Sequence, residues 1–220
     1  MKIFDEYARK YDDWYEKPFG KSAFNLELKC LNEILPKTYS EKSIEVGVGT
    51  GRFASALGIN LGLDTSNEEL KIAAKRGIEV VLGDAHNMPL RDNAFDLVLV
   101  VVSICFFKEP VRVLKEIGRV LKEEGVLVLG LILLESPWAE FYMKKAKKGH
   151  PLYSHAKFYS YKEISTMLKN ANFSIERILS TLFEKPQEEV PVVNKEVKEE
   201  FHVNGGFFCI KARKASITEQ

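Results

Sequence analysis

The segment from Ser43 to Gly51, S-I-E-V-G-V-G-T-G, constrains the fold of this chain more than any other stretch. Its first four residues predict a short buried strand. Gly47, Gly49 and Gly51 then follow at alternate positions. Glycine adopts backbone conformations closed to other residues and carries no Cβ, so a ligand can lie directly against backbone N–H groups here. A helix expected from Arg52 onwards would add the partial positive charge of its N-terminus, which suits a phosphate or a carboxylate.

Two later strands are each expected to end in an aspartate. The apolar segment 59–63 stops at Asp64, and the segment 79–82 runs into Gly83 and Asp84. In an open parallel α/β sheet, the ligand crevice lies beyond the carboxyl ends of the strands. The glycine turn and both aspartates are therefore predicted to face one crevice.

The rest of the chain alternates between helical and strand patterns. Helices are expected over residues 4–14, 24–35, 52–57, 68–76, 110–121, 137–148 and 161–170, and strands over 43–46, 59–63, 79–82, 95–102, 126–134, 173–183 and 207–212. This order predicts an α/β fold with a doubly wound parallel sheet. No helix separates the last two strands, so they are expected to pair antiparallel. Residues 122–125 are expected to form a charged turn, and residues 184–200 a mobile surface connection.

Length and composition indicate one globular domain. The chain has 220 residues, of which 45% are hydrophobic and 29% charged, and a net charge of +1. Such a balance gives no overall field that would recruit nucleic acid or an anionic membrane. Nucleic-acid binding would depend on the lysines at 144–148 alone and is ranked last. The three cysteines lack metal-ligand spacing, and no secretion signal is present, so a cytoplasmic location is expected.

Two ligands suit a glycine turn followed by strand-end carboxylates: a dinucleotide and S-adenosylmethionine (AdoMet). Asp64 lies 17 residues beyond Gly47, close to the spacing expected for an acid that accepts both ribose hydroxyls. That spacing suits either ligand. The dinucleotide fingerprint G-x-G-x-x-G, however, would place its third glycine at Arg52. A nicotinamide-dependent oxidoreductase is therefore the weaker alternative.

Three further motifs accompany the turn. Residues 45–51, E-V-G-V-G-T-G, look like the motif E/D-x-G-x-G-x-G, and residues 83–85 with 88–90 look like a G-D-A-x-x-L-P-F stretch. F-D-L-V at 95–98 and L-K-E-I-G-R-V-L-K at 114–122 extend the match to about Leu129. On these motifs the chain resembles the class I AdoMet-dependent methyltransferases, particularly the small-molecule type similar to ubiquinone- and menaquinone-biosynthesis methyltransferases.

The resemblance implies a Rossmann-like, seven-stranded sheet with its last strand antiparallel. It also implies that Asp64 holds the ribose, that Asp84 bonds the adenine amino group, and that a tyrosine of the first helix, Tyr11 or Tyr7, lies over the cofactor. We expect one domain, made of a helical lid at 1–40, a cofactor-binding core at 43–134 and substrate-side helices and strands at 135–220. The expected cofactor contacts are Tyr11, Glu45, Gly47, Gly49, Gly51, Asp64, Thr65, Gly83, Asp84, Ala85, His86 and Ser103. No metal is expected.

The catalytic group is not apparent from the sequence. Many small-molecule methyltransferases carry a His or Asp after the fourth strand, whereas this chain has S-I-C-F-F at 103–107. His150, Tyr153 and His155 are candidates for a base, since a loop histidine can act in a substrate pocket. A pocket short of a base suits a nucleophile that is already deprotonated, or a neutral amine. The sequence therefore predicts methyl transfer to a small molecule by in-line displacement, with a non-catalytic AdoMet-binding module as the alternative.

Overall fold

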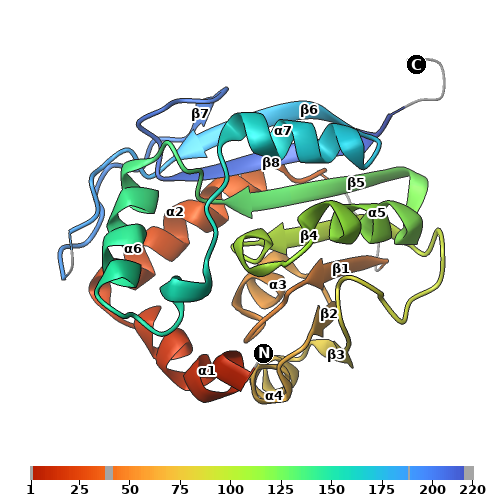
Figure 1. The fold of residues 1–220 in the computed structure, drawn as a ribbon, viewed down its shortest axis with the longest axis horizontal. Helices are drawn as coiled ribbons and strands as arrows, with labels where there is room; N and C mark the ends of the chain where they lie inside the picture. The colour runs from red at the N-terminus through yellow and green to blue at the C-terminus, as the bar shows by residue number, and fades with distance from the viewer. Residues whose placement is uncertain (1, 38–41, 188, 216–220) are drawn as a thin grey trace.

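A computed structural model describes residues 2–37, 42–187 and 189–215 of the chain. It has one mostly parallel sheet with helices on both faces (Figure 1). The helices are α1 (Lys2–Trp14), α2 (Pro18–Ile34), α3 (Arg52–Leu57), α4 (Asn67–Lys75), α5 (Pro110–Val120), α6 (Pro137–Lys147) and α7 (Tyr161–Asn170), with short 3-10 turns η1 (Ile104–Phe106) and η2 (Tyr153–His155). The strands are β1 (Ser43–Val46), β2 (Leu61–Asp64), β3 (Glu79–Leu82), β4 (Phe95–Val101), β5 (Leu121–Leu131), β6 (Phe173–Thr181), β7 (Lys198–Glu199) and β8 (Phe207–Lys214).

The sheet order is β3-β2-β1-β4-β5-β8-β6-β7. Strands β1 to β5 pair in parallel, and β8 lies antiparallel between β5 and β6. The doubly wound prediction and the antiparallel last strand are thus confirmed. The described sheet has eight strands, not seven, because the two-residue β7 pairs with Leu179 and Ser180 of β6. β7 lies in the segment that was expected to be a plain connection.

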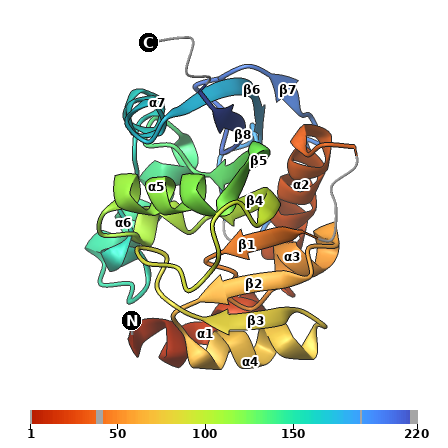
Figure 2. The same ribbon diagram turned by 90° about the vertical axis from the view of Figure 1, so that its right-hand side faces the viewer.

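The burial of strand β4 on both faces explains why its sequence is almost entirely apolar. Leu97 and Leu99 face one hydrophobic cluster, while Val98 and Val100 face the other. Residues of α2, α3 and α6 take part in the first cluster, and residues of α5 and α7 in the second. Figure 2 shows α2 and α3 on the opposite side of the sheet from α5 and α7. A strand buried on both faces needs apolar residues at successive positions.

The prediction of a charged turn at 122–125 is wrong, because β5 begins at Leu121 and includes these residues. Leu121 pairs with Phe95, but the next pair joins Val126 to Leu97, so β5 carries extra residues at this point. A bulge of this kind lets the charged side chains leave the ladder without ending the strand. Strand β5 also ends at Leu131, three residues before the predicted end.

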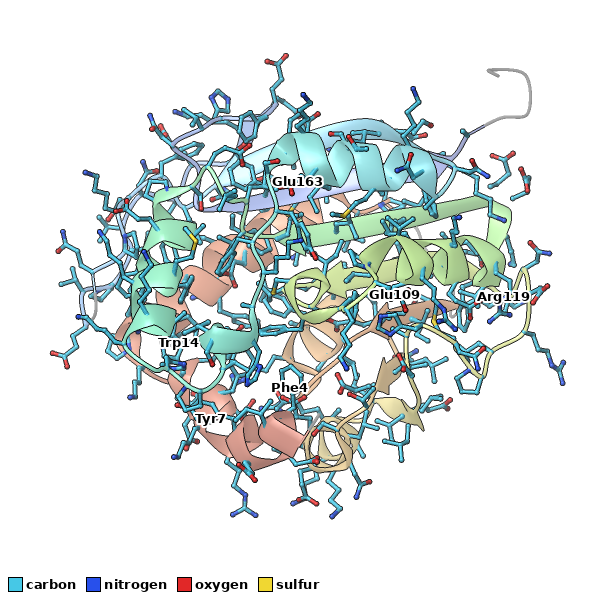
Figure 3. All side chains as sticks on the ribbon, in the orientation of Figure 1. Phe4, Tyr7, Trp14, Glu109, Arg119 and Glu163 are labelled. Atoms are coloured by element: carbon cyan, nitrogen blue, oxygen red, sulfur yellow. The ribbon has the colours of Figure 1, made fainter. Side chains whose placement is uncertain are left out.

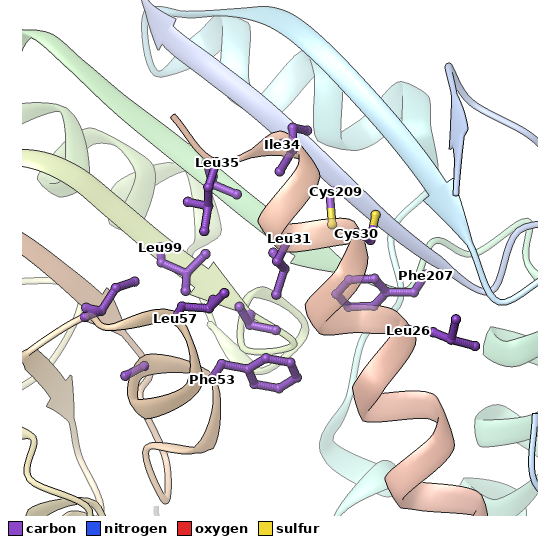
Figure 4. Close-up of a cluster of buried hydrophobic side chains, with 14 of the residues drawn as sticks. Leu26, Cys30, Leu31, Ile34, Leu35, Phe53, Leu57, Leu99, Phe207 and Cys209 are labelled. Carbon is purple, nitrogen blue, oxygen red and sulfur yellow. The ribbon is translucent and has the colours of Figure 1, made fainter. Parts of the chain in front are cut away.

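The two N-terminal helices lie in different places. Helix α2 packs on the sheet, where Leu31 and Ile34 are buried beneath it (Figure 4). Its Cys30 meets Cys209 of β8 in this core, and both thiols are free. Helix α1 instead lies beside α4, near the carboxyl ends of the parallel strands (Figure 1). No helix in the described part of the chain is long and apolar enough to cross a membrane.

Candidate active site

The site lies where the strand order reverses, between the carboxyl ends of β1 and β4. Gly47 follows β1 with φ +75°, and the Ser103 hydroxyl after β4 donates a 2.9 Å hydrogen bond to its carbonyl. A Cβ on Gly47 would come within 2.6 Å of Ser103 Oγ, so the close approach of the two strand ends requires glycine. Ligands of open α/β sheets bind at such a switch point.

Asp64, at the end of β2, is bonded to the glycine loop. Its Oδ2 accepts a 2.9 Å hydrogen bond from the Gly49 N–H, and its Oδ1 accepts one of 2.9 Å from the Ser66 N–H. Burial raises the pKa of this carboxyl, and the backbone donors oppose the rise. Gly49 has φ +51°, and a Cβ built on it would meet no atom closer than Glu69 Oε1 at 3.8 Å. The floor at Gly49 is therefore open to a ligand.

A cavity of about 480 Å³ opens above this floor. Eleven of the twelve predicted cofactor contacts line it: Tyr11, Glu45, Gly47, Gly49, Asp64, Thr65, Gly83, Asp84, Ala85, His86 and Ser103. The volume falls within the range of pockets for small molecules and cofactors. The sequence prediction that the glycine turn and both aspartates share one crevice agrees with this placement.

Gly51 is the predicted contact that does not line the cavity. It is the N-cap of α3, with φ +77°, and a Cβ on it would come within 2.9 Å of the Ala73 Cβ in α4. Its position serves helix packing behind the loop, because only glycine combines this φ with so close an approach.

Three carboxyl groups converge on the cavity wall. Glu45 is 1% exposed, and burial raises its pKa well above the usual value, although the Ala54 N–H opposes the shift. Glu69 is also buried, and burial with the neighbouring Asp64 raises its pKa to about 8. The sequence analysis did not assign Glu69 to the site. Several buried carboxyl groups in a common wall favour a positively charged ligand.

The Asp84 carboxylate lies at the cavity rim. Its Oδ1 accepts a 2.9 Å hydrogen bond from the His86 N–H and is 2.6 Å from His86 Nδ1. These contacts hold the pKa of Asp84 below its usual value. The His86 Nε2 in turn accepts a hydrogen bond from the Glu109 N–H, so this loop is tied to the start of α5. Figure 3 marks Glu109 at that point.

Helix α1 closes the cavity from the opposite side. Phe4, Tyr7 and Tyr11 of α1 line the cavity together with Tyr15, which directly follows the helix, and Figure 3 marks Phe4 and Tyr7 on α1. Of these, the sequence analysis named Tyr7 and Tyr11. Neighbouring rings in this part of the molecule include Phe106, which packs edge-on against Phe4.

Two aspartates fasten α1 to the cofactor loops. Asp5 Oδ1 accepts hydrogen bonds from the Ser66 hydroxyl and the Glu68 N–H at the start of α4. Asp12 accepts from the hydroxyl of Thr50, from Arg52 and from Arg76. Both aspartates lie on the polar side of this amphipathic helix. In the structure that side faces the glycine loop.

Arg52 gains its role from this arrangement. Its Nε donates a 2.7 Å hydrogen bond to Asp12 Oδ1, and its Nη2 bonds the Asp12 carbonyl oxygen and Glu16. The residue that replaces the third glycine of a dinucleotide motif is therefore the residue that holds the first helix against the loop. Only a knowledge of the tertiary contacts could have assigned it.

The three candidate bases lie outside the main cavity. The His150 ring packs against that of Tyr153 at a tilt of 32°, with ring centroids 4.4 Å apart, and His155 is exposed. Leu152 of the same loop lines the main cavity instead. Tyr153 borders a second, smaller cavity beside it.

The comparisons with known proteins agree with this geometry. Residues 44–129 match a family model described as "Methyltransferase domain". A SAM-dependent methyltransferase from Thermotoga maritima, described as a possible histamine N-methyltransferase, has a solved structure that superposes with a TM-score of 0.86 at 35% identity, covering 97% of this chain and 98% of that one. An uncharacterised protein of Methanocaldococcus jannaschii is 35% identical over 214 residues, 97% of this chain and 100% of that protein. Demethylmenaquinone methyltransferase of Thermotoga maritima is 35% identical over 137 residues, 59% of each chain.

A switch-point cavity with a glycine floor and acids at successive strand ends defines an α/β protein that binds a nucleoside-containing ligand. The chain belongs to the class I AdoMet-dependent methyltransferases. It is an enzyme with AdoMet as its cofactor, and the nicotinamide alternative is set aside.

Proposed function

We propose that this enzyme methylates a small molecule, with AdoMet held between the glycine loop and helix α1. In this assignment the Asp64 carboxylate receives the ribose hydroxyls, and Asp84 with the backbone N–H of Ala85 receives the adenine ring. Tyr11 covers the cofactor from α1. The observation that carries the proposal is the contact of Asp64 with Gly49 in the wall of a cavity that Asp84 and Tyr11 also line.

The wall fits the charge of this cofactor. AdoMet supplies a methyl group already activated by a sulfonium, so the protein has chiefly to position the two reactants. Glu45 Oε2 is buried without a hydrogen-bond partner among the described residues, and Glu69 is held in the same wall. These carboxyl groups provide acceptors for the cationic part of the ligand. Closure by α1 keeps water out of the space above the glycines.

No side chain is assigned as a general base. Several acidic and basic groups at the main cavity are paired with one another, as in Asp84 with His86 and Asp12 with Arg52. The wall after β4 is formed by Ser103, Phe106 and Phe107. An acceptor atom that is already deprotonated, or a neutral amine nitrogen, needs no base from such a wall.

The names of the relatives support a small molecule as the methyl acceptor, although they point to acceptors of different chemical types. One is named for a quinone precursor and another as a possible histamine methyltransferase. We propose a single domain with the lid at 1–40, the core at 43–134 and the substrate side at 135–220. Three free cysteines support a reducing, cytoplasmic location.

The test is calorimetry with AdoMet, followed by an acceptor screen. We expect the wild-type protein to bind AdoMet and to release S-adenosylhomocysteine when it is given amines, phenols, thiols or quinols. Binding without product from any acceptor class would support a non-catalytic AdoMet-binding module. The absence of binding at millimolar AdoMet would overturn the proposal.

A further inference from the structure

A second, smaller cavity lies directly beside the main one. Its volume is about 50 Å³, and it shares the residues Tyr11, Tyr15, Val102, Phe106 and Leu152 with the main cavity. The two spaces are therefore separated by a common set of side chains. By volume, the smaller one has room for roughly three or four non-hydrogen atoms.

Aromatic rings form most of its wall. Seven of its thirteen lining residues are Phe, Tyr or Trp, and they come from α1, η1, α6 and the 152–158 loop. The rings of Tyr142 and Tyr153 are 4.5 Å apart between centroids. The Tyr11 and Tyr15 hydroxyls bond each other at 2.8 Å, so these two partner one another. Ring faces of this kind attract an organic cation.

One carboxyl group, that of Glu27 in α2, borders this aromatic wall. Glu27 is 5% exposed, and its Oε2 has no hydrogen-bond partner among the described residues. Burial raises its pKa to about 8. Glu27 lines this cavity together with Tyr11 and Tyr142. A buried carboxyl without a partner is costly, which points to a ligand that pairs with it.

No lysine, arginine or histidine lines the second cavity within residues 2–37, 42–187 and 189–215. His150 stands behind Tyr153 and does not border the space. None of these described side chains therefore supplies a cation for Glu27, and a bound ligand can provide it. Aromatic faces with one carboxylate provide both attractions that an ammonium group needs, the ring quadrupoles and an opposite charge.

We propose that the second cavity holds the ammonium group of a small organic amine, with Glu27 as its counter-ion, and that this amine is the methyl acceptor. The inference deepens the proposed function and rests on it. A protonated nitrogen has no lone pair, so in this arrangement the ammonium is an anchor. The shared wall of Tyr11, Phe106 and Leu152 then directs another atom of the acceptor towards the main cavity, where the methyl group is received.

The test measures binding and needs no turnover. Wild-type protein saturated with S-adenosylhomocysteine is titrated with n-propylammonium and, separately, with the neutral n-propanol, by calorimetry and by tryptophan fluorescence. Trp14 lines the cavity, whereas the other tryptophan, Trp138, is buried and bonds the Glu184 carbonyl. We expect n-propylammonium to bind and to change the fluorescence, and n-propanol to bind at least tenfold more weakly. Equal binding of the two, or no binding of n-propylammonium, would overturn the inference.

Two variants locate the site. Glu27→Gln keeps the shape of a neutral carboxyl and should lower the affinity for n-propylammonium at least tenfold, with the affinity for S-adenosylhomocysteine unchanged. The matched control is Glu33→Gln, which changes an exposed glutamate of the same helix and should bind like the wild type. Unchanged amine binding by Glu27→Gln would refute the role of Glu27. Failure of the wild type to bind S-adenosylhomocysteine would instead refute the proposed function, so the two failures are distinguishable.

Discussion

Asp64 Oδ2 lies 2.9 Å from the backbone nitrogen of Gly49, so the acid that ends β2 accepts a hydrogen bond from the loop that ends β1. The parallel pairing of the two strands brings these groups together, since Val46 is in register with Leu63. The same carboxyl also accepts from the Ser66 N–H. One side chain thus fixes the cavity floor and keeps an oxygen at the cavity wall.

Replacing Asp64 should weaken cofactor binding. For Asp64→Ala we expect a loss of about 1–3 kcal/mol in AdoMet affinity, because groups that were paired in a buried site lose their partner. Calorimetry measures the change. Glu79→Ala serves as the control and should bind AdoMet normally, because it removes an exposed acid at the start of β3, away from the carboxyl ends of the strands. An unchanged affinity in Asp64→Ala would remove Asp64 from the site.

Gly49 offers a second test, with a control of similar backbone strain. A methyl group in Gly49→Ala would project into the cavity, so AdoMet affinity should fall at least tenfold. Gly58→Ala has a similar φ of +69°, but nothing lies within 4 Å of its added Cβ. Both variants should lose about 1 kcal/mol of unfolding free energy from left-handed backbone strain. If Gly58→Ala impaired AdoMet binding as much, strain and not cavity filling would explain the effect.

The contacts of Asp12 hold α1 against the glycine loop, and their contribution to stability can be measured. Its carboxylate contacts Thr50, Arg52 and Arg76, and its side chain is 18% exposed. Asp12→Asn should cost about 1–3 kcal/mol of stability at pH 7, because charge-assisted hydrogen bonds in a shielded site are lost. Denaturant unfolding measures this, with Asp13→Asn, an exposed neighbour, as control.

The same variant has a predicted pH dependence. Burial raises the pKa of Asp12, but the hydrogen bonds from Arg52 and Arg76 lower it by more, so that the pKa lies below its usual 3.8. A carboxyl with a lowered folded pKa contributes its stability above the unfolded pKa and loses it as the pH falls through the folded pKa. The difference between the wild type and Asp12→Asn should therefore be full at pH 6 and shrink below pH 4. A difference that stayed constant down to acid pH would contradict the assigned ion pairs.

The contribution of Glu27 to stability changes with pH in the opposite direction to that of Asp12. Its pKa rises from 4.5 to about 8 on burial, so the folded protein binds a proton that the unfolded chain releases. Stability from this group is present below pH 4.5 and is lost as the pH rises through 8. Glu27→Gln should match the wild type near pH 4.5 and be more stable at pH 9, as measured by urea unfolding. Glu69, with a pKa of about 8, contributes the same trend and keeps some pH dependence in the variant. Equal stability of the two proteins at pH 9 would refute a buried, unpaired Glu27.

The local parts of this protein follow from its sequence. The predicted bounds of β1, β3 and α3 match the structure. Glycines and aspartates beside these apolar runs mark where each element ends. The capping box of Ser160 and Glu163 at the start of α7 is local in the same way, since it depends on residues three apart. Ten of the eleven predicted contacts that line the cavity lie at or after the strand ends, because parallel strands bring their carboxyl ends to one edge, whereas Tyr11 comes from α1.

Only the tertiary structure assigned the groups that meet from distant segments. Asp12 and Arg52 are 40 residues apart, and periodicity on α1 cannot say which polar face receives a partner. Glu27 looks like one more polar residue of an amphipathic helix until α1, α6 and the 152–158 loop enclose it. Sequence determined the strand ends and the glycine floor because those depend on local backbone chemistry. Packing decided the lid contacts and the second cavity, because burial and charge pairing are properties of surfaces that exist only after the chain has folded.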